Sequence, residues 1–332
     1  MAGAVSLQGM QSNMRYGVPY KGSKNNIAEW IYSHFPKVSN FYDLFAGGCA
    51  VTQIALMKQE FKNYFCNDID NSGINLFLNA IYGKYQNETR WISREDFFRL
   101  KNSDPYIKYA WSFGNNGRDY LYSKEIEPLK KAWHYAIYFN DFSLADKMGV
   151  DLSGIKYFQS FYEKYIVSKS ILRQYGDENF FRNIEIERQQ QLESLNRLQS
   201  LQSLQSLQSL QSLQSLQSLQ SSYNEVPILS DSVIYCDIPY INTNAYGNKK
   251  DNLSFNREKF YEWCRRQSEL VIISEYTMPD NFICIDEIEK KVTLCAGSDH
   301  SAMERLFIPE HQAELWQKIK PVKWFQQELF FM

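Results

Sequence analysis

Residues 41–67 combine strand-like and helix-like segments in an order that restricts the fold. An apolar run at residues 41–45 leads into Gly47 and Gly48, an apolar helical pattern follows, and a second apolar run covers residues 64–67. A strand, a glycine turn, a helix and a second strand form the basic unit of α/β proteins. We therefore predict an α/β chain whose sheet is mostly parallel.

The glycine turn has features of a nucleotide-binding loop. Glycines allow the backbone to approach a ligand closely, and the N-terminus of the following helix offers free N–H groups. The dinucleotide pattern G-x-G-x-x-G is not present, because Cys49 and Thr52 stand where its later glycines would be. An acid about 20 residues after such a turn commonly holds ribose hydroxyls, and Asp68 closes the second strand at that spacing. Asp70 is an alternative that could equally cap the next helix, so we favour Asp68.

A further apolar run, residues 233–236, ends in Asp237-Ile238-Pro239-Tyr240. The exocyclic amine of a base is a poor nucleophile, and two acceptors that fix its N–H groups would direct its lone pair at a methyl donor. The Asp237 carboxylate and the Ile238 carbonyl can be these acceptors, because Pro239 biases the residue before it to an extended conformation. Tyr240 can stack on the base, which is worth roughly 1–3 kcal/mol. Taken alone, the four residues are equally consistent with an ordinary turn after a strand.

Together with the glycine turn, these residues resemble the DNA N6-adenine methyltransferases of the alpha group, the class that includes the Dam enzymes. The matched motifs are the aromatic-x-Gly-Gly-Lys type at residues 20–24, Asp-x-Phe-x-Gly at 43–47, the acidic ribose-binding motif at 67–69 and Asp-Pro-Pro-Tyr at 237–240, followed by core strands at 271–276 and 304–308. The resemblance extends from residue 16 to about residue 308 and is weakest between residues 82 and 232.

Three residues depart from the family pattern. Ser23 replaces the second glycine of the first motif. Ile238 replaces a proline of the catalytic motif, which the chemistry tolerates because the group required is a backbone carbonyl. Cys49 replaces a glycine of the cofactor loop, where a positive φ would cost about 1 kcal/mol or more. We therefore expect Cys49 to adopt an ordinary backbone conformation.

The resemblance implies a Rossmann-like methyltransferase sheet with an inserted, mostly helical target-recognition region. It implies that S-adenosylmethionine donates a methyl group to N6 of an adenine flipped out of double-stranded DNA. Asp237, Ile238, Pro239 and Tyr240 would be catalytic. Tyr20 and Lys24 would line the methionine and adenosine end of the cofactor, Asp43, Phe45 and Gly47 would lie against it, Asp68 would hold its ribose, and Asp237 would contact both the cofactor and the target amine.

We divide the chain into four segments: a cofactor-binding part at 16–82, a helical target-recognition insertion at 83–190, a Leu-Gln-Ser repeat at 191–222, and at 223–332 the catalytic part of the same methyltransferase domain. In the repeat, leucine recurs at every third residue. Because a packed helix needs a spacing of 3.6 and a coiled coil needs 3.5, these leucines cannot stay on one helix face. We interpret the repeat as a low-complexity insertion without a role in the chemistry.

The net charge is −2, so contacts with DNA phosphates would need local basic patches. The candidates are Lys249-Lys250, Arg257, Arg265-Arg266, and Lys130-Lys131 with Arg118, each of which is more often a solvated face than a phosphate contact. Lys249-Lys250 is the strongest, because it follows the catalytic motif closely. Loops at residues 111–118 and 140–143 are candidates for reading bases, since Asn and Arg side chains can bind base edges. A simple turn shaped by glycine remains the commoner explanation of the first loop.

The cysteine pattern and the hydropathy limit the other partners. The six cysteines include no C-x-x-C pair and the four histidines stand apart, so we expect no metal. Cysteines inside apolar strands favour reduced thiols and a cytoplasmic protein. With no signal-peptide pattern and no apolar span near 20 residues, we expect no membrane association. We expect a bacterial or phage-encoded monomer, and any cognate restriction endonuclease would be a separate protein.

Two other functions remain open at this stage. N4-cytosine methyltransferases face the same amine chemistry, but they more often carry Ser-Pro-Pro-Tyr, so Asp237 favours adenine; protein-glutamine methylases carry Asn at this position and fit less well. A DNA-binding module with an inactive methylase core would explain Cys49 and Ile238. The intact Lys24 and Asp68 favour an active enzyme instead.

Overall fold

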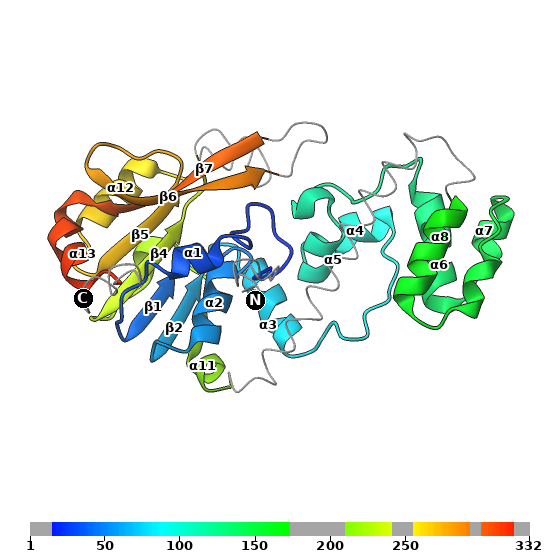
Figure 1. Cartoon of the computed structure of the whole chain (residues 1–332), viewed down its shortest axis with the longest axis horizontal. Helices are drawn as coiled ribbons and strands as arrows, with labels where there is room; N and C mark the ends of the chain where they lie inside the picture. The colour runs from blue at the N-terminus through cyan, green and yellow to red at the C-terminus, as the bar shows by residue number, and fades with distance from the viewer. Residues whose placement is uncertain (1–14, 173–209, 241–254, 293–299, 322–332) are drawn as a thin grey trace, which may run out of the picture.

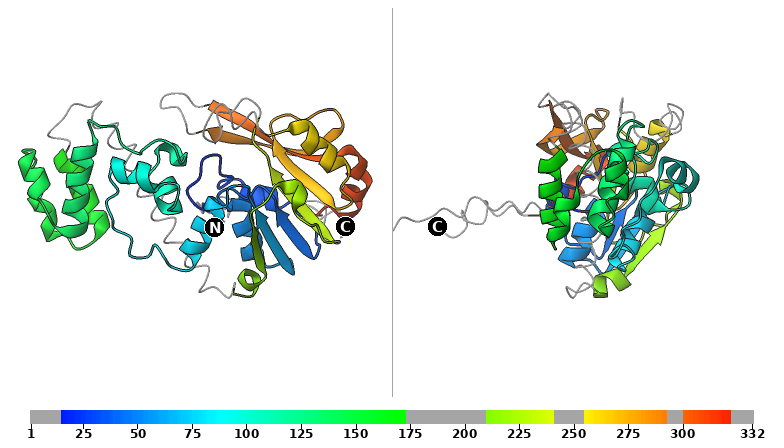
Figure 2. Two further views of the ribbon diagram at one scale, coloured as in Figure 1. Left: turned by 180° about the vertical axis from the view of Figure 1, so that it is seen from behind. Right: turned by 90° about the vertical axis from the view of Figure 1, so that its right-hand side faces the viewer.

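The computed structural model describes residues 15–172, 210–240, 255–292 and 300–321. A sheet with flanking helices forms one end of the molecule, and helices from residues 94–172 extend away from it (Figure 1). Figure 2 shows the same two parts from behind and from the side. The predicted α/β fold with an inserted, mostly helical region is confirmed.

Among the described residues, seven strands form one sheet in the order β3-β2-β1-β4-β5-β7-β6. The strands are β1 (Asn40–Asp43), β2 (Asn63–Asn67), β3 (Leu216–Leu219), β4 (Ser232–Asp237), β5 (Leu270–Glu275), β6 (Phe282–Val292) and β7 (His300–Pro309). Neighbours from β3 to β5 pair in parallel, whereas β7 pairs antiparallel with both β5 and β6. The sheet is therefore mostly parallel, as predicted.

Strand β1 lies between β2 and β4, and its last residue, Asp43, is in register with Cys66 on one side and Tyr235 on the other. The strand order reverses at this point, and in open α/β sheets ligands bind outside the carboxyl ends of the strands at such a reversal. Asp237 is the last residue of β4, and the segments that follow β1 and β2 carry the glycine turn and Asp68. The topology thus brings together groups that are far apart in the sequence.

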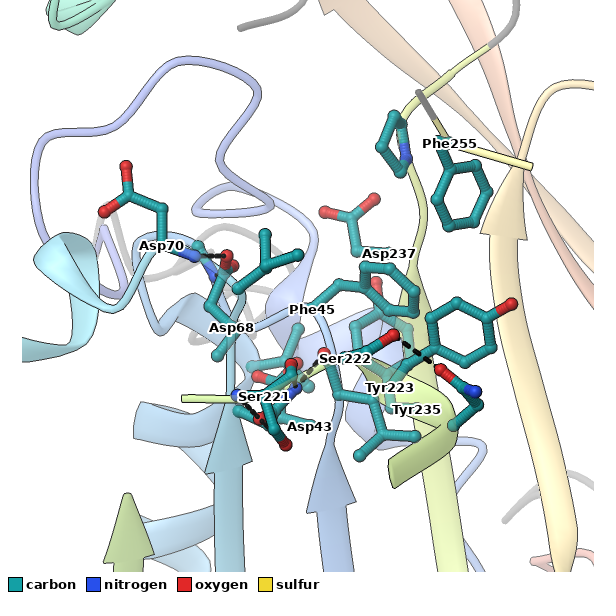
Figure 3. A pocket seen from close by; sticks show the side chains of 18 of the residues that line it. Asp43, Phe45, Asp68, Asp70, Ser221, Ser222, Tyr223, Tyr235, Asp237 and Phe255 are labelled. Carbon is teal, nitrogen blue, oxygen red and sulfur yellow. Dashed lines mark hydrogen bonds between the residues drawn. The ribbon is translucent and has the colours of Figure 1, made fainter. Parts of the chain in front are cut away.

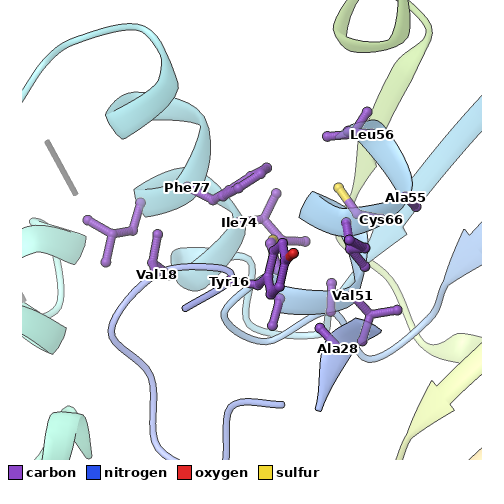
Figure 4. Close-up of a cluster of buried hydrophobic side chains, with 14 of the residues drawn as sticks. Tyr16, Val18, Ala28, Val51, Ala55, Leu56, Cys66, Ile74 and Phe77 are labelled. Atoms are coloured by element: carbon purple, nitrogen blue, oxygen red, sulfur yellow. The ribbon is translucent and has the colours of Figure 1, made fainter. Parts of the chain in front are cut away.

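Alternate residues of the central strands face two helical layers. Helices around the sheet are α1 (Ala28–Tyr32), α2 (Ala50–Lys58), α3 (Ser72–Ile81), α11 (Leu210–Gln214), α12 (Arg257–Arg265) and α13 (Ala313–Ile319), with 3-10 turns η3 (Tyr223–Glu225) and η4 (Glu310–Gln312). Phe41 and Tyr235 point into the core formed with α1, α2 and α3, part of which is shown in Figure 4. Tyr42 and Ile234 point into the core formed with α12. Burial on both faces explains why the strands are almost continuously apolar.

The helical insertion divides into two packed parts. Its elements are α4 (Arg94–Leu100), α5 (Pro105–Ala110), η1 (Phe113–Asn115), α6 (Glu127–Phe139), α7 (Ser143–Lys147), η2 (Ser153–Tyr157) and α8 (Phe161–Leu172). Tyr106 of α5 and the adjacent Trp111 belong to the core that covers the sheet. Trp133 of α6 and Ala145 of α7 belong to a separate core that also includes η2. Only residues from about 126 onward therefore form a unit with its own core, whereas the first part of the insertion is continuous with the sheet.

The end of the Leu-Gln-Ser repeat is part of the sheet, and our interpretation of the whole repeat as an insertion was wrong for these residues. Strand β3 pairs in parallel with β2 at the sheet edge, with Leu216 opposite Tyr64. Just before it, the Ser212 hydroxyl donates to the Leu56 carbonyl at 3.0 Å. The edge of β2 offers unpaired backbone groups to an extended segment, and leucine spacing carries no information about such pairing. Residues 191–209 of the repeat lie outside the described residues.

Candidate active site

A cavity of about 1110 Å³ opens at the carboxyl ends of β1, β2 and β4 (Figure 3). It is lined by eight of the residues that the sequence pointed to, namely Tyr20, Lys24, Asp43, Phe45, Gly47, Asp68, Asp237 and Pro239. Ile238 and Tyr240 are not among its lining residues: the Ile238 side chain lies in the core beside α12, and Tyr240 lies next to the cavity wall. The glycine turn and the Asp237 segment thus share one cleft.

Residues of the repeat also line this cavity, which sequence reasoning missed. Ser221 and Ser222 follow β3 and lie at the cavity, as Figure 3 shows. Ser221 is fixed by Asn67 at the end of β2, because the Ser221 N–H donates to the Asn67 Oδ1 at 3.1 Å. No local signal could have found them, since the same Leu-Gln-Ser triplets precede them in the sequence.

Cys49 adopts a left-handed backbone conformation, with φ 58° and ψ 30°, so our expectation of an ordinary conformation was wrong. The conformation closes the turn before α2: the Cys49 N–H donates to the Ala46 carbonyl at 2.6 Å, and the Cys49 carbonyl accepts from Gln53 N–H at 2.9 Å. A left-handed residue with a Cβ costs about 1–2 kcal/mol. The fully buried position and the two hydrogen bonds maintain it.

The two glycines of the turn allow Tyr20 to lie directly over it. A Cβ on Gly48 would come within 2.6 Å of the Tyr20 Cβ, and one on Gly47 within 2.9 Å of the Tyr20 ring. Tyr20 also contacts Tyr109 of α5, with ring centroids 4.9 Å apart. The glycines are therefore required here by the packing of the N-terminal segment.

Asp43 has one buried carboxylate oxygen that accepts no hydrogen bond from the residues that the structure describes. Its Oδ2 accepts from the Thr52 hydroxyl at 2.7 Å, whereas its Oδ1 has no hydrogen-bond partner within the described parts of the chain. The side chain is only 2% exposed, and burial raises its pKa to about 7. A buried acceptor without a donor is costly, and a donor group of a bound ligand would satisfy it.

Asp68 and Asp70 have different environments. Asp68 accepts backbone N–H groups from Gly47 at 2.9 Å and from Asp70 at 3.0 Å, and burial raises its pKa to about 6. Asp70 contacts Ser72 at the start of α3 and pairs with the Lys108 ammonium at 2.6 Å. Burial alone would raise the pKa of Asp70, but Lys108 and Ser72 outweigh it and lower the pKa. Asp70 is thus engaged at the start of α3, whereas Asp68 is held at the glycine turn, and both line the cavity.

Lys24 is buried and faces Asp237. Its Nζ lies 2.7 Å from the Asp237 Oδ1 and 3.7 Å from the Glu304 Oε1, and the residue is 4% exposed. Burial alone would lower the pKa of Lys24, but Asp237 and Glu304 outweigh it and raise the pKa. The lysine therefore stays charged and holds Asp237 at the cavity wall.

Tyr240 is held by three side chains. Its hydroxyl donates to Glu304, its ring meets the Tyr276 ring edge-on with centroids 4.6 Å apart, and Lys24 Nζ lies 4.4 Å from its centroid. The role of Glu304 was not foreseen from the sequence. The signal that could have found it is an acidic residue in a core strand, two positions before Leu306 and therefore on the same strand face as this apolar residue.

Arg257 contacts the backbone of the segment that follows Asp237. Its guanidinium donates to the Pro239 carbonyl and, at 3.0 Å, to Glu275 Oε2, whose side chain is fully buried. Sequence reasoning placed Arg257 among candidate phosphate contacts. In the structure the guanidinium instead points into the protein, toward Glu275 and the Pro239 carbonyl.

The comparison with known families decides between the alternatives. The model of the D12 class N6 adenine-specific DNA methyltransferase family matches residues 20–277. The chain belongs to this family. A search of curated proteins found no match.

As a member of the D12 class, the chain is an adenine-specific DNA methyltransferase, and the resemblance seen in its motifs is confirmed. The match spans both the glycine turn and the Asp237 segment, which together line the cavity. The residues that the family model matches thus include those that form the cleft at the strand ends.

Besides Arg257, two more of the basic patches considered for DNA binding can be located in this methyltransferase. Lys130 is buried, 2% exposed, with its ammonium near the Tyr122 and Trp133 rings, so the expectation of a solvated face was wrong for it. Arg266 is exposed and lies at the cavity rim. Lys249-Lys250 lie outside the described residues.

Within the described residues, no group of three or more His, Cys, Asp or Glu side chains could hold a metal ion. Nor does that part of the chain include a helix long and apolar enough to cross a membrane.

Proposed function

We propose that this methyltransferase transfers the methyl group of S-adenosylmethionine to N6 of an adenine that is flipped out of duplex DNA. The observation that carries the proposal is the single cavity in which Asp43 and Asp68, at the ends of β1 and β2, face Asp237 at the end of β4. Two different ligands can meet there, a nucleoside-type cofactor on one side and a base on the other.

The β1–β2 side fits the cofactor. Asp68 closes β2 and has a carboxylate suited to the ribose hydroxyls. The Asp43 Oδ1, which has no hydrogen-bond partner among the residues that the structure describes, offers an acceptor to a polar group of the cofactor. Phe45 and Tyr20 supply apolar surface, and the carboxylates that line the cavity suit a cationic ligand. When bound, S-adenosylmethionine supplies a methyl group that is activated by the positive charge on its sulfur.

The β4 side fits the base. Asp237 is within reach of the cavity, and Arg257 fixes the peptide that follows Ile238 by bonding the Pro239 carbonyl. In our proposal the Asp237 carboxylate and the Ile238 carbonyl accept the two N–H groups of the target amine, and Tyr240 stacks on the ring. Flipping the base costs a few kcal/mol, which these contacts offset.

Lys24 keeps Asp237 oriented while the amine reacts. The nitrogen loses one proton once it is methylated, and Asp237 is placed to receive it. Asp237 does not have to be a strong base, because the amine becomes acidic only after transfer. Positioning is therefore the main contribution of the protein.

We further propose that the insertion contributes to DNA recognition. The loop with η1 contacts the N-terminal segment next to the cavity, because Lys21 N–H donates to the Asn115 carbonyl at 3.2 Å. Duplex DNA whose adenine enters the cavity would thus pass near residues 111–118. The division of the chain at residues 83 and 190 stays a proposal.

The test uses the purified enzyme. Calorimetry should detect S-adenosylmethionine binding, and nucleoside analysis of methylated duplex DNA should find N6-methyladenine. Asp68→Ala should weaken cofactor binding by roughly 10-fold or more, the scale of one hydrogen bond to a charged group. Asp280→Ala, at an exposed turn before β6, is the matched control. Equal cofactor affinity of Asp68→Ala and the wild type would refute the assigned role.

A further inference from the structure

Strand β7 carries a buried carboxylate that none of the roles above requires. Glu304 is 1% exposed, and Leu306 and Ile308, which lie on the same face of β7, are fully buried in the apolar core. An acidic residue at such a position loses its hydration and needs partners. Its partners are the Tyr240 hydroxyl and the Lys24 ammonium.

Negative groups outnumber positive groups around Lys24. Lys24 is shared between Asp237, at 2.7 Å, and Glu304, at 3.7 Å, so two carboxylates face one cation. Lys24 would keep the nearer carboxylate, Asp237, if Glu304 were replaced, so the cation does not need Glu304 as its counter-ion. The Tyr240 hydroxyl, in contrast, would lose this acceptor. Charge pairing with Lys24 alone therefore does not explain why an acid is there.

The geometry around Tyr240 offers an explanation. Tyr276 contacts the ring edge-on, Lys24 lies over the ring, and Glu304 accepts from the hydroxyl. Burial, together with the nearby Asp237 and Glu304, raises the pKa of Tyr240 well above its ordinary value, so the hydroxyl remains a donor. Of the three contacts, the hydrogen bond to Glu304 is the one that sets the direction of the ring axis.

We propose that Glu304 is a positioning residue for methyl transfer: by holding the Tyr240 hydroxyl, it fixes the ring on which the flipped adenine stacks. The inference rests on the proposed function of Tyr240 and adds a residue from β7 to it. Glu304 acts through Tyr240 and does not itself contact the base.

The test compares Glu304→Leu, Glu304→Gln, Tyr240→Phe and the double variant Glu304→Leu/Tyr240→Phe. Glu304→Leu should lower kcat by roughly 10- to 100-fold, the scale of a small misplacement of a reacting group. Its melting temperature should fall modestly, because the buried Tyr240 hydroxyl loses an acceptor, whereas its affinity for S-adenosylmethionine should match that of the wild type. Glu304→Gln keeps an acceptor for the hydroxyl and should recover part of the lost activity. Tyr240→Phe should lose activity to a similar extent.

The double variant separates positioning from an independent effect. If Glu304 acts through the hydroxyl, the double variant is no slower than the slower single variant. Duplex DNA with 2-aminopurine at the target adenine gives a second readout, because stacking on Tyr240 quenches its fluorescence. Glu304→Leu should leave this base less quenched, whereas loss of fold stability alone would not change quenching in the folded fraction.

Two results would overturn the inference while leaving the proposed function intact: wild-type kcat in Glu304→Leu, or losses that multiply in the double variant. Should Glu304→Leu not fold, Tyr240→Phe alone decides, and an unchanged kcat in it overturns the inference. A wild-type enzyme that forms no N6-methyladenine would instead overturn the proposed function.

Discussion

Lys24 and Asp237, which are 213 residues apart in the chain, form a buried ion pair with 2.7 Å between Nζ and Oδ1. The pair joins the N-terminal segment, which packs over the glycine turn, to the end of β4. The contact thus connects the two sides of the cavity, and in our proposal it links the cofactor side to the carboxylate that holds the target amine.

Lys24→Met should therefore impair both stability and catalysis. It leaves Asp237 and Glu304 facing each other without a cation, and removal of one partner of a buried pair costs about 3–5 kcal/mol. We expect a lower free energy of unfolding and a kcat reduced by roughly 100-fold. Denaturant unfolding and steady-state kinetics measure the two effects. Lys58→Met, at the exposed end of α2, is the control and should change neither; a fully active Lys24→Met would contradict the role of the pair.

Asp43 should make stability depend on pH. Burial raises its pKa to about 7, so between about pH 4 and pH 7 the folded protein retains a proton that the unfolded chain has released. This contribution to stability is therefore lost as the pH rises through that window, and it levels off above pH 7. Asp43→Asn removes the titration, so its free energy of unfolding should fall less between pH 5 and 7.5 than that of the wild type. Parallel pH profiles of the two proteins would rule out a raised pKa for Asp43.

Inside an ordinary helix, alanine is more stabilising than glycine. At position 49 we expect the reverse, with Cys49→Gly more stable than Cys49→Ala. Both variants lose the buried sulfur, but only glycine relieves the left-handed conformation at φ 58°. We expect the glycine variant to be more stable than the alanine variant by about 1 kcal/mol. At Ala55, inside α2, the change to glycine should instead destabilise by about 1 kcal/mol. Urea unfolding provides the comparison, and an alanine variant as stable as the glycine variant would argue against backbone strain.

Arg257→Ala should leave the buried Glu275 without its cation and release the Pro239 carbonyl. We expect a loss of about 3 kcal/mol in stability, part of which Glu275→Gln should restore in the double variant. The kcat should remain low in the double variant, because the backbone of the catalytic motif is still unbraced. Arg266→Ala, at an exposed position in the same helix region, serves as the stability control. Recovery of full activity in the double variant would show that the brace is not needed.

The parts of the site that are formed by consecutive residues could be predicted from the sequence. Apolar runs that end in Asp43, Asp68 and Asp237 predicted three strand ends, and a parallel sheet brings such ends together. The glycine turn was recognisable, but the left-handed Cys49 was not, because its conformation depends on hydrogen bonds that only the folded turn creates.

The features that the sequence did not predict depend on contacts between residues that are far apart in the chain. Glu304 reaches Tyr240 from a strand 64 residues later in the chain, and no pattern along the sequence indicates that meeting. Strand β3 arises from triplets identical to their neighbours, so only the free edge of β2 decides which of them becomes a strand. Arg257 appeared to be a surface cation until the burial of Glu275 was known.

The central claim is that Asp237 acts on an adenine in the cavity. Expression in a host without DNA methylases, followed by sequencing with detection of modified bases, tests it most directly. We predict N6-methyladenine within one short DNA motif for the wild type and for Asp280→Ala, and none for Asp237→Ala. Methylation that persists in Asp237→Ala, or a wild-type product modified at N4 of cytosine, would contradict it.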